Sequence, residues 1–328
     1  AMCGGGAIGA VGEAARYAAQ RRQFGRPIAA FGAVRHKLGE MVSRTYGVQS
    51  LVYRTAGLID RRIADAPQEP GGTPASVAAL EEYAVEASIA KVAGSETLDY
   101  VLDENVQIHG GNGYVRDYPA ERHYRDARVN RIFEGTNEIN RLLIAGMLAR
   151  RAARGRLGLI PAAQALQDEL LGPPMPPGDD GEPLAEEGQI VESLRKASLM
   201  GLGLAMQAYR DDLGEQQEVL LLLADMLIDT YAADSVVLRA RAAGADGLPD
   251  RALHADAARV FVHGAAARAE MAGRQALAIM AEGDTLRTLV SAQRRLFRQL
   301  PANLALPRRR LAEAAVASGR YVFEGAVR

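Results

Sequence analysis

The chain has 328 residues, 48% of them apolar, and its 39 Lys and Arg nearly balance its 40 Asp and Glu. The length suggests about two domains, and the net charge of −1 argues against bulk nucleic-acid binding, which usually needs a basic excess. The single cysteine, Cys3, cannot form an internal disulfide, so an oxidising secretory compartment is not indicated.

Helical patterning dominates the first part of the chain. Ala7 to Arg22 reads as one helix that breaks at Pro27, and residues 31–65 form a long amphipathic helix because apolar side chains recur at three- and four-residue spacing. Pro and Gly make 65–74 a loop, and 76–109 is a second long helix that Gly110 and Gly111 end. Shorter helices follow near 118–129 and 137–153, which together predict an antiparallel helical bundle.

The stretch LGPPMPPGDDGEP at 171–183 is the clearest boundary, because its prolines cannot continue a helix. Beyond it the helical pattern resumes at about 186–212, 215–243, 250–281, 284–299 and 308–324. We therefore predict an all-α chain. An antiparallel four-helix-type bundle occupies 1–155, a linker 156–185, and a second helical domain 186–328.

Metal and membrane signals are weak throughout. The five histidines, at 36, 109, 123, 254 and 263, include no pair at a metal-ligand spacing such as HExxH, so no metal site is predicted. No charged-then-apolar signal segment opens the chain. The longest apolar run, VLLLLADMLI at 219–228, contains Asp225 and is far shorter than the ~20 residues of a membrane span.

The stretch VQIHGGNGYVRDYPAERHYRDARVNRIFEGTNEINR at 106–141 holds the residues best suited to chemistry. Glu134 stands directly before Gly135, at the start of a predicted helix. It is either a general base close to a ligand that the glycine lets approach, or a helix-start Glu favoured by the helix dipole. The backbone N–H groups of 136–138 either bind an anionic or carbonyl ligand or are capped by Thr136 or Asn137.

Two further features need context. Arg21, in YAAQRRQFGRPIAAF at 17–31, has a planar guanidinium suited to phosphate, but a surface basic patch with Arg22 and Arg26 is the plainer interpretation. The glycines of GGNG at 110–113 are by themselves only a turn signal.

In their order and spacing, these motifs resemble the C-terminal helical domain of the flavin-dependent acyl-CoA dehydrogenases. The features that match are Arg21 three residues before Phe-Gly, the Gln-Ile-x-Gly-Gly-x-Gly loop, a Tyr-Pro-x-Glu-x-x-x-Arg-Asp run and Glu-Gly-Thr. The resemblance covers about residues 3–153.

The resemblance implies an FAD cofactor and a fatty acyl-CoA substrate. Glu134 would remove the α-proton of the thioester while hydride leaves the β-carbon for flavin, and Gly135 would lie against CoA. Such a base must be positioned and partly desolvated, because an α-proton of a thioester is only weakly acidic. The residues implied to contact flavin are Arg21, Gln23, Gln107, Ile108, His109, Gly110, Gly111, Thr136, Asn137 and Glu138.

Some of these contacts would be made across a dimer seam. Arg21 and the loop at 107–111 are implied to touch the flavin of a neighbouring subunit, so a homodimer is expected, with an electron-transfer flavoprotein as electron acceptor. His109 occupies a variable position and is interpreted as a packing or capping residue. The family's N-terminal helical and middle β domains are not recognised in the 328 residues, so we expect them to be absent and the isolated chain to be inactive.

Residues 186–328 carry no motif that points to chemistry. Their size and position resemble the helical extension of the very-long-chain type of acyl-CoA dehydrogenase. Seven arginines and no acid lie at 287–310, which either contact anionic lipid at a membrane surface or form a cluster paired with acids elsewhere.

Other functions stay open. One is a helical scaffold or assembly protein that keeps the fold, and another is an acyl-CoA oxidase or nitroalkane-type oxidase. A composition rich in Ala, Arg and Gly favours a bacterial source, and therefore a cytoplasmic protein with or without membrane association.

Overall fold

The computed structural model describes residues 1–66, 74–172, 182–298 and 301–323. Most of these residues are helical, which confirms the all-α prediction. The strands found in the described residues are β1 (Arg22–Gln23) and β2 (Arg26–Pro27), an antiparallel pair in which Arg22 faces Pro27. The helices, in chain order, are α1 (Met2–Gln20), η1 (Ile28–Ala30), α2 (Gly32–Ala64), α3 (Ala75–Glu82), α4 (Ala84–His109), η2 (Gly110–Tyr114), α5 (Ala120–Ala127), η3 (Arg128–Arg131), α6 (Asn137–Ala153), α7 (Leu159–Leu171), α8 (Ala185–Tyr209), η4 (Arg210–Glu215), α9 (Gln217–Ala245), α10 (Arg251–Met280), α11 (Gly283–Leu296) and α12 (Ala305–Ser318).

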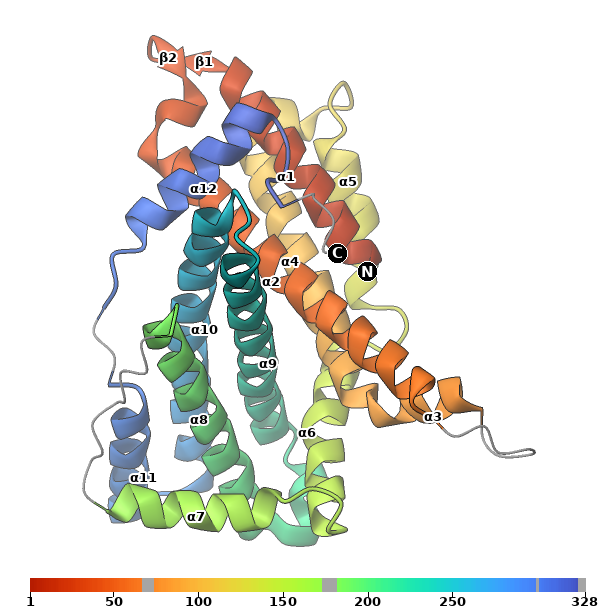
Figure 1. Cartoon of the computed structure of the whole chain (residues 1–328), viewed down its shortest axis with the longest axis vertical. Helices are drawn as coiled ribbons and strands as arrows, with labels where there is room; N and C mark the ends of the chain where they lie inside the picture. Colours follow the sequence, from red (N-terminus) through yellow and green to blue (C-terminus); the bar gives the residue numbers. More distant parts are fainter. Residues whose placement is uncertain (67–73, 173–181, 299–300, 324–328) are drawn as a thin grey trace.

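The first half of the molecule, α1 to α6, is built around α4, which packs against α1, α2 and α6. The buried face of α1 consists almost entirely of small residues, among them Ala7, Ala14 and Ala18. Small side chains let the backbones of two helices approach closely. The second half, α8 to α12, is built on α8, α9 and α10, which pack on one another side by side, while α7 lies across one end of this group and α12 across the other (Figure 1).

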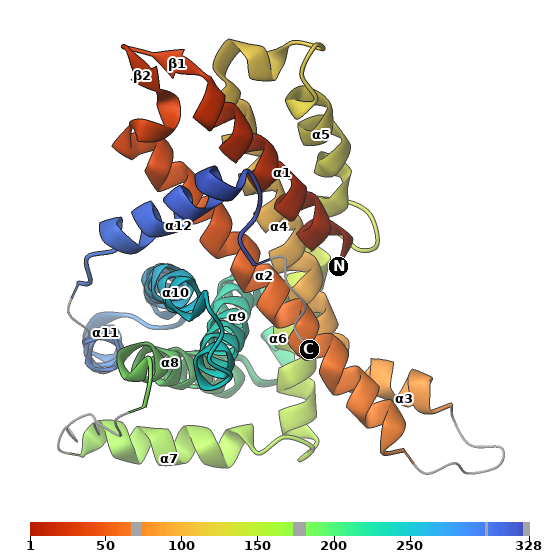
Figure 2. The same ribbon diagram turned by 45° about the horizontal axis from the view of Figure 1, so that its top comes forward.

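Helix α2 runs between the two halves in both views (Figures 1 and 2). One face contacts α1 and α4, and the other contacts α9, α10 and α12. Gly39 and Gly47 lie on the second face, where an added Cβ would come within 2.5 Å of the Arg308 carbonyl oxygen and 2.2 Å of the Phe261 ring, respectively. Buried residues of both halves therefore form one hydrophobic core.

Several predicted helices match the structure closely, including those expected at 215–243 and 250–281, which are α9 and α10, whereas one is divided. The helices expected at 31–65 and 137–153 are α2 and α6. The helix expected over 76–109 is instead divided at Tyr83 into α3 and α4. The guanidinium of Arg151, on α6, donates to the carbonyls of Glu81 at 2.9 Å and Glu82 at 2.8 Å, so a tertiary contact satisfies the groups that the break frees.

The segment predicted as a linker, 156–185, contains helix α7 over Leu159–Leu171. Pro161 is tolerated because it lies in the first turn, where its missing N–H has no partner to lose. Residues 173–181, the core of the predicted boundary, lie outside the described residues. The division into domains at 155 and 185 stays a prediction.

The arginine-rich stretch 287–310 is not one continuous basic segment. In its described part it is divided between α11 and α12, and two of its arginines pair with acidic residues of α2 and α10. Arg308 pairs with Glu40 at 2.6 Å and Arg310 with Asp256 at 2.5 Å. This favours the interpretation as a cluster paired with acids over lipid contact. Within the described ranges, no helix has the length and apolar character needed to cross a bilayer.

Candidate active site

The turn that carries Glu134 has an unusual backbone. Glu134 has φ +54° and Gly135 has φ +81°, so two successive residues are left-handed. For a residue with a side chain this conformation is uncommon and costs about 1–2 kcal/mol. Helix α6 begins directly afterwards, and its N-cap Thr136 accepts a hydrogen bond from the backbone N–H of Ile139 at 3.3 Å. The capping role considered for Thr136 is thus present in the structure.

A polar network beneath the turn holds it in place. The ammonium of Lys91, on α4, donates to the carbonyl of Gly135 at 2.6 Å and to Oδ1 of Asn137 at 2.8 Å. The side-chain amide of Asn140 also donates to the Gly135 carbonyl, at 2.9 Å. Burial lowers the pKa of Lys91, which the nearby Cys3, Glu138 and Glu134 oppose. The turn is therefore fixed from the protein side by charged and amide donors.

Asn137 points into the protein and not toward a ligand. Only 1% of the residue is exposed, and its amide also donates to Ser95 and Glu96, both at 3.0 Å. A flavin contact by Asn137 would therefore have to use its backbone N–H. Glu138 is exposed, and hydrogen bonds from its own backbone and from Thr136 at the start of α6 lower the pKa of its carboxyl group.

Glu134 itself is exposed, so the described residues of this chain do not form the tight, desolvated pocket expected around it. Its surroundings are nevertheless apolar. Phe133 and Ile139 are exposed by 42% and 57%, and Val129 and Ile132 are also exposed. Large apolar side chains grouped on a surface mark a site that another molecule or domain covers.

Arg21 and Gln23 lie at one end of the molecule, on the β1–β2 hairpin and its approach (Figure 1). Both side chains are exposed. The hairpin turns at Phe24 and Gly25, with φ +50° and +80°, and Phe24 is 91% exposed. The guanidinium of Arg26 stacks 4.1 Å above the ring of Phe31, and that of Arg22 donates to the Gly25 carbonyl at 3.0 Å.

The predicted cofactor loop at 107–111 is partly buried. The ring of His109 stacks on Tyr17 with the centroids 4.0 Å apart, and its Nδ1 lies 2.8 Å from the Asn105 carbonyl, so it packs as expected for the variable position. The side chain of Ile108 is also buried. Gln107, Gly110 and Gly111 are exposed, and an added Cβ at either glycine would meet nothing within 4 Å. Of the side chains of this loop, only that of Gln107 is exposed, and Gly110 and Gly111 expose their backbone.

The predicted site residues therefore form two groups. The hairpin and the 107–111 loop lie at the same end of the molecule (Figures 1 and 2), where the Tyr17 hydroxyl donates to the His109 carbonyl at 3.1 Å. The Glu134 turn contacts Lys91, and the segment of α4 from Lys91 to His109 rises roughly 27 Å along the helix axis. Within a single chain, only a ligand long enough to span this distance could contact both groups at once.

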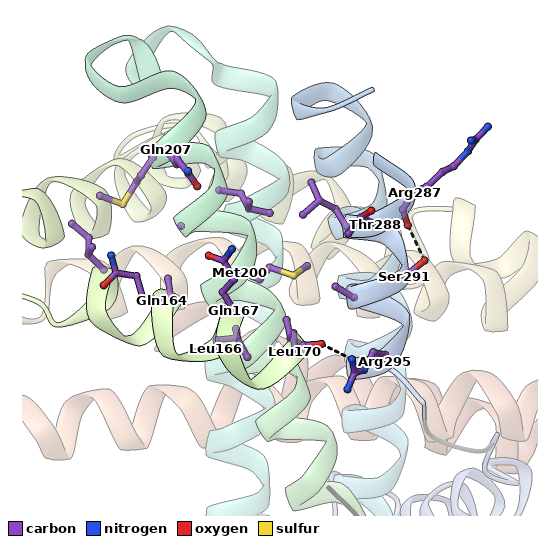
Figure 3. Close-up of a pocket in the computed structure, with 17 residues that line it drawn as sticks. Gln164, Leu166, Gln167, Leu170, Met200, Gln207, Arg287, Thr288, Ser291 and Arg295 are labelled. Carbon is purple, nitrogen blue, oxygen red and sulfur yellow. Dashed lines mark hydrogen bonds between the residues drawn. The ribbon is translucent and has the colours of Figure 1, made fainter. Parts of the chain in front are cut away.

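A groove of about 870 Å³ lies elsewhere, between α7, α8 and α11 (Figure 3). Leucines, Met200 and Met206 form its apolar surface, and Gln164, Gln167 and Arg287 lie among its polar lining. Arg295 donates to the carbonyls of Leu170 and Gly172 at the end of α7. The described residues that line the groove include no carboxylate, histidine or cysteine, so it offers no acid–base chemistry. It could not be foreseen, because one of its walls is the unpredicted helix α7.

Sequence spacing also missed one cluster of potential metal ligands. Ligand atoms of Glu186, Glu187 and His263 lie within 4.8 Å of one another. Glu187 is buried, and Arg259 lies 3.4 Å from its carboxylate. Because Arg259 already balances this charge, we assign the cluster no metal.

Comparison with known proteins identifies the relatives of this arrangement. Two family models match, at residues 1–149 and 193–295, and both describe the acyl-CoA dehydrogenase C-terminal domain. Together they match well over half of the chain. The chain belongs to the acyl-CoA dehydrogenase family.

Individual relatives agree. The chain is 41% identical over 327 residues to a probable acyl-CoA dehydrogenase of Bacillus subtilis, covering 96% of this chain and 54% of that protein. A crystal structure of an acyl-CoA dehydrogenase from Bacillus anthracis, complexed with FAD, superposes with a TM-score of 0.93 at 42% identity, covering 97% of this chain and 55% of that one. A bovine mitochondrial very long-chain specific acyl-CoA dehydrogenase is 31% identical over 273 residues, 74% of this chain and 37% of that protein.

The chain thus spans about half the length of the acyl-CoA dehydrogenases that it matches. This corrects the expectation that the family's N-terminal helical and middle β domains are absent. The match runs along 96% of the chain against a full-length relative, so the chain corresponds to about half of such an enzyme.

Proposed function

We propose that this chain is the base-bearing part of an FAD-dependent acyl-CoA dehydrogenase that forms an α,β-double bond in a fatty acyl-CoA. The observation that carries the proposal is the backbone of Glu134. It is held in a left-handed conformation on a turn that Lys91 and Asn140 fix through the Gly135 carbonyl. Strain of this kind persists only where the surroundings impose it, and it is concentrated at functional sites.

In this proposal the Glu134 carboxylate takes the proton from the α-carbon of the thioester. The exposed Phe133, Ile132 and Ile139 side chains provide an apolar surface beside it. An acyl chain lying on that surface would exclude water from the carboxylate and hold the α-carbon within reach of the base. The positive φ of Gly135 lets the backbone turn immediately after the base, beside the position proposed for CoA.

The residues present fit an FAD cofactor. Gly110 and Gly111 expose backbone with open space where side chains would stand, and Arg21 offers a guanidinium suited to a pyrophosphate. Gln23 and Gln107 are exposed on the same end of the molecule, whereas Ile108 and His109 would contribute through backbone only. Near Glu134, the first N–H groups of α6 have no intrahelical carbonyl partner. The Asn137 N–H is the one proposed to contact the flavin, because the Glu138 N–H bonds its own carboxylate. Bound FAD would supply an acceptor for the hydride that leaves the β-carbon.

The roughly 27 Å between the two groups supports a homodimer. In this arrangement the Glu134 turn serves the flavin of its own subunit, and Arg21 and the 107–111 loop reach the flavin of the partner subunit. We further propose an electron-transfer flavoprotein as acceptor, from the family resemblance. The alignment with the bovine very long-chain relative, which extends beyond the length of the first half, supports an extension of that type. The bacterial cytoplasmic location and the inactivity of the isolated chain stay predictions.

The decisive experiment replaces Glu134 by Gln in the FAD-loaded enzyme that contains this chain. Dehydrogenation of acyl-CoA should fall by about 10²–10⁴-fold, because the α-proton loses its acceptor, while the flavin spectrum is unchanged. Glu121→Gln is the matched control, since Glu121 is a carboxylate on α5 that pairs with the exposed Arg125 and belongs to neither group of predicted site residues. Undiminished turnover in Glu134→Gln would refute the role of this residue. Rapid reoxidation of the reduced flavin by oxygen would favour the oxidase alternative.

A further inference from the structure

A continuous series of hydrogen bonds joins the Glu134 turn to the second half of the molecule. It begins with Lys91, which donates to the Gly135 carbonyl and to Oδ1 of Asn137. Nδ2 of Asn137 donates to Oε1 of Glu96 at 3.0 Å. Lys91 and Glu96 both lie on α4, so this first part stays within the first half.

Arg141 continues the series across to α9. Its Nη1 and Nη2 donate to the two oxygens of Glu96 at 2.7 and 2.9 Å, and its Nε donates to Oδ1 of Asp225 at 2.7 Å. Asp225 is on α9, in the second half. Burial alone would raise the pKa of Glu96, but hydrogen bonds and charge from Arg141, with Asn137 and Arg131, lower it overall, so Glu96 stays a carboxylate acceptor.

The charged groups in this series decide which partner donates and which accepts in every hydrogen bond. A carboxylate only accepts and a guanidinium or ammonium only donates, whereas an amide can turn over and exchange its donor and acceptor. Asp225 binds Nε of Arg141 and so orients the guanidinium, whose Nη1 and Nη2 then face Glu96. Because the Glu96 carboxylate only accepts, Asn137 must turn its NH₂ group toward it. The amide oxygen of Asn137 is consequently turned toward Lys91, which leaves Lys91 directed at Gly135.

We propose that Asp225, acting through Arg141 and Glu96, is a positioning residue for the catalytic base Glu134. The second half would then contribute to the reaction rate without supplying an acid, a base or a contact to substrate. This inference rests on the proposed role of Glu134. Its physical basis is that a left-handed, exposed turn has little packing of its own, so the network beneath it, which includes the buried Asn137, must hold it.

The chain contains a matched control for Asp225. Asp234, nine residues further along α9, also crosses to the first half, where it accepts from Arg54 on α2 at 2.7 Å. This pair contacts neither Asn137 nor the Glu134 turn. Asp234 also accepts from Arg195 on α8, so its replacement breaks at least as many ion pairs as that of Asp225. Asp225→Asn and Asp234→Asn therefore remove the same charge from the same helix and each breaks a link between the halves, but only the first interrupts the series.

The two variants are compared by kinetics in the FAD-loaded enzyme that contains this chain. Asp225→Asn should lower kcat about 10-fold or more through misplacement of the base, with KM and bound FAD unchanged. The isotope effect with α-deuterated acyl-CoA should rise, since proton removal becomes slower. Asp234→Asn should stay within twofold of the parent. Asp225→Glu keeps the charge and should therefore retain most of the parent rate. If Asp225 had a merely structural role, the isotope effect of Asp225→Asn would equal that of the parent enzyme.

A second readout does not depend on activity. Amide hydrogen exchange in residues 131–139 of the purified chain should be faster in Asp225→Asn than in Asp234→Asn. Equal kcat, isotope effect and exchange in the two variants would overturn the inference while leaving the proposed function standing, provided that Glu134→Gln is inactive. Full activity in Glu134→Gln would overturn the base assignment and the catalytic part of this inference together.

Discussion

At the scale of single residues, the turn at Glu134 combines strain with exposure. Of the non-glycine residues in the described chain, four have positive φ, and Glu134 is one of them. The sequence placed Glu134 correctly at the start of a helix, because Gly-Thr-Asn is a strong local signal for a turn and a cap. Its left-handed conformation could not be foreseen, since Lys91, which holds the next carbonyl, lies more than forty residues earlier.

Glu134→Gly provides a test of this strain. Glycine adopts positive φ without steric cost, whereas a residue with a side chain pays about 1–2 kcal/mol. After allowing for the larger entropy of glycine in the unfolded chain, we expect the free energy of unfolding to rise by about 0.5–1 kcal/mol. Urea unfolding measures the change.

The control for this variant is Glu121→Gly. Glu121 is within helix α5, where glycine should lower the free energy of unfolding by about 1 kcal/mol. Equal losses of stability in both variants would show that Glu134 is not strained.

At the scale of elements, α2 is more than the one-sided amphipathic helix that its apolar spacing predicts. Its second face carries Gly39, Ser43 and Gly47 at successive four-residue intervals, and the Ser43 hydroxyl donates to the Ala257 carbonyl of α10 at 2.9 Å. These small residues allow α10 and α12 to approach closely. Hydrophobic periodicity does not reveal such a face, because glycine and serine read as polar or neutral positions.

Gly39→Ala should destabilise the contact between α2 and α12. The added Cβ would lie 2.5 Å from the carbonyl oxygen and 2.7 Å from the Cα of Arg308, and backbone atoms cannot move aside as a flexible side chain can. We expect a loss of about 1–3 kcal/mol in the free energy of unfolding, typical of overpacking.

Gly57→Ala, on the same helix, is the comparison for this loss. An added Cβ at Gly57 meets nothing within 4 Å, so this variant should gain about 0.5–1 kcal/mol. Similar unfolding midpoints for the two variants would contradict the close approach of α12.

At the scale of the whole molecule, the two halves share one core and are joined by polar links. One such link is the Arg141–Asp225 pair. In another, the hydroxyl of Tyr46 on α2 lies 2.8 Å from Nδ1 of His254 on α10. Near the C-terminal end, Tyr321 and Phe323 return to α2, where the Phe323 ring packs 4.7 Å from that of Tyr46. The predicted division into two domains therefore does not correspond to two separate cores.

Calorimetry should show one unfolding transition for the purified chain. Because buried residues of α2 contribute to the packing of both halves, neither half can unfold without exposing the surface of the other. The calorimetric and van't Hoff enthalpies should then agree, as for a cooperative two-state transition. Two resolved peaks, or a van't Hoff enthalpy near half the calorimetric value, would show instead that the halves unfold independently.

The sequence by itself determined that this protein is helical, where most of its long helices lie, and which motifs of an acyl-CoA dehydrogenase it carries and in what order. Helical periodicity, capping and motif spacing are local properties, so α2 and α6 were predicted almost to the residue. Only the tertiary structure decided the break at Tyr83, the inward direction of Asn137 and the exposure of Glu134. It also revealed the network from Asp225 to Gly135. Each of these depends on contacts between residues tens of positions apart, whose geometry arises only when the helices pack together.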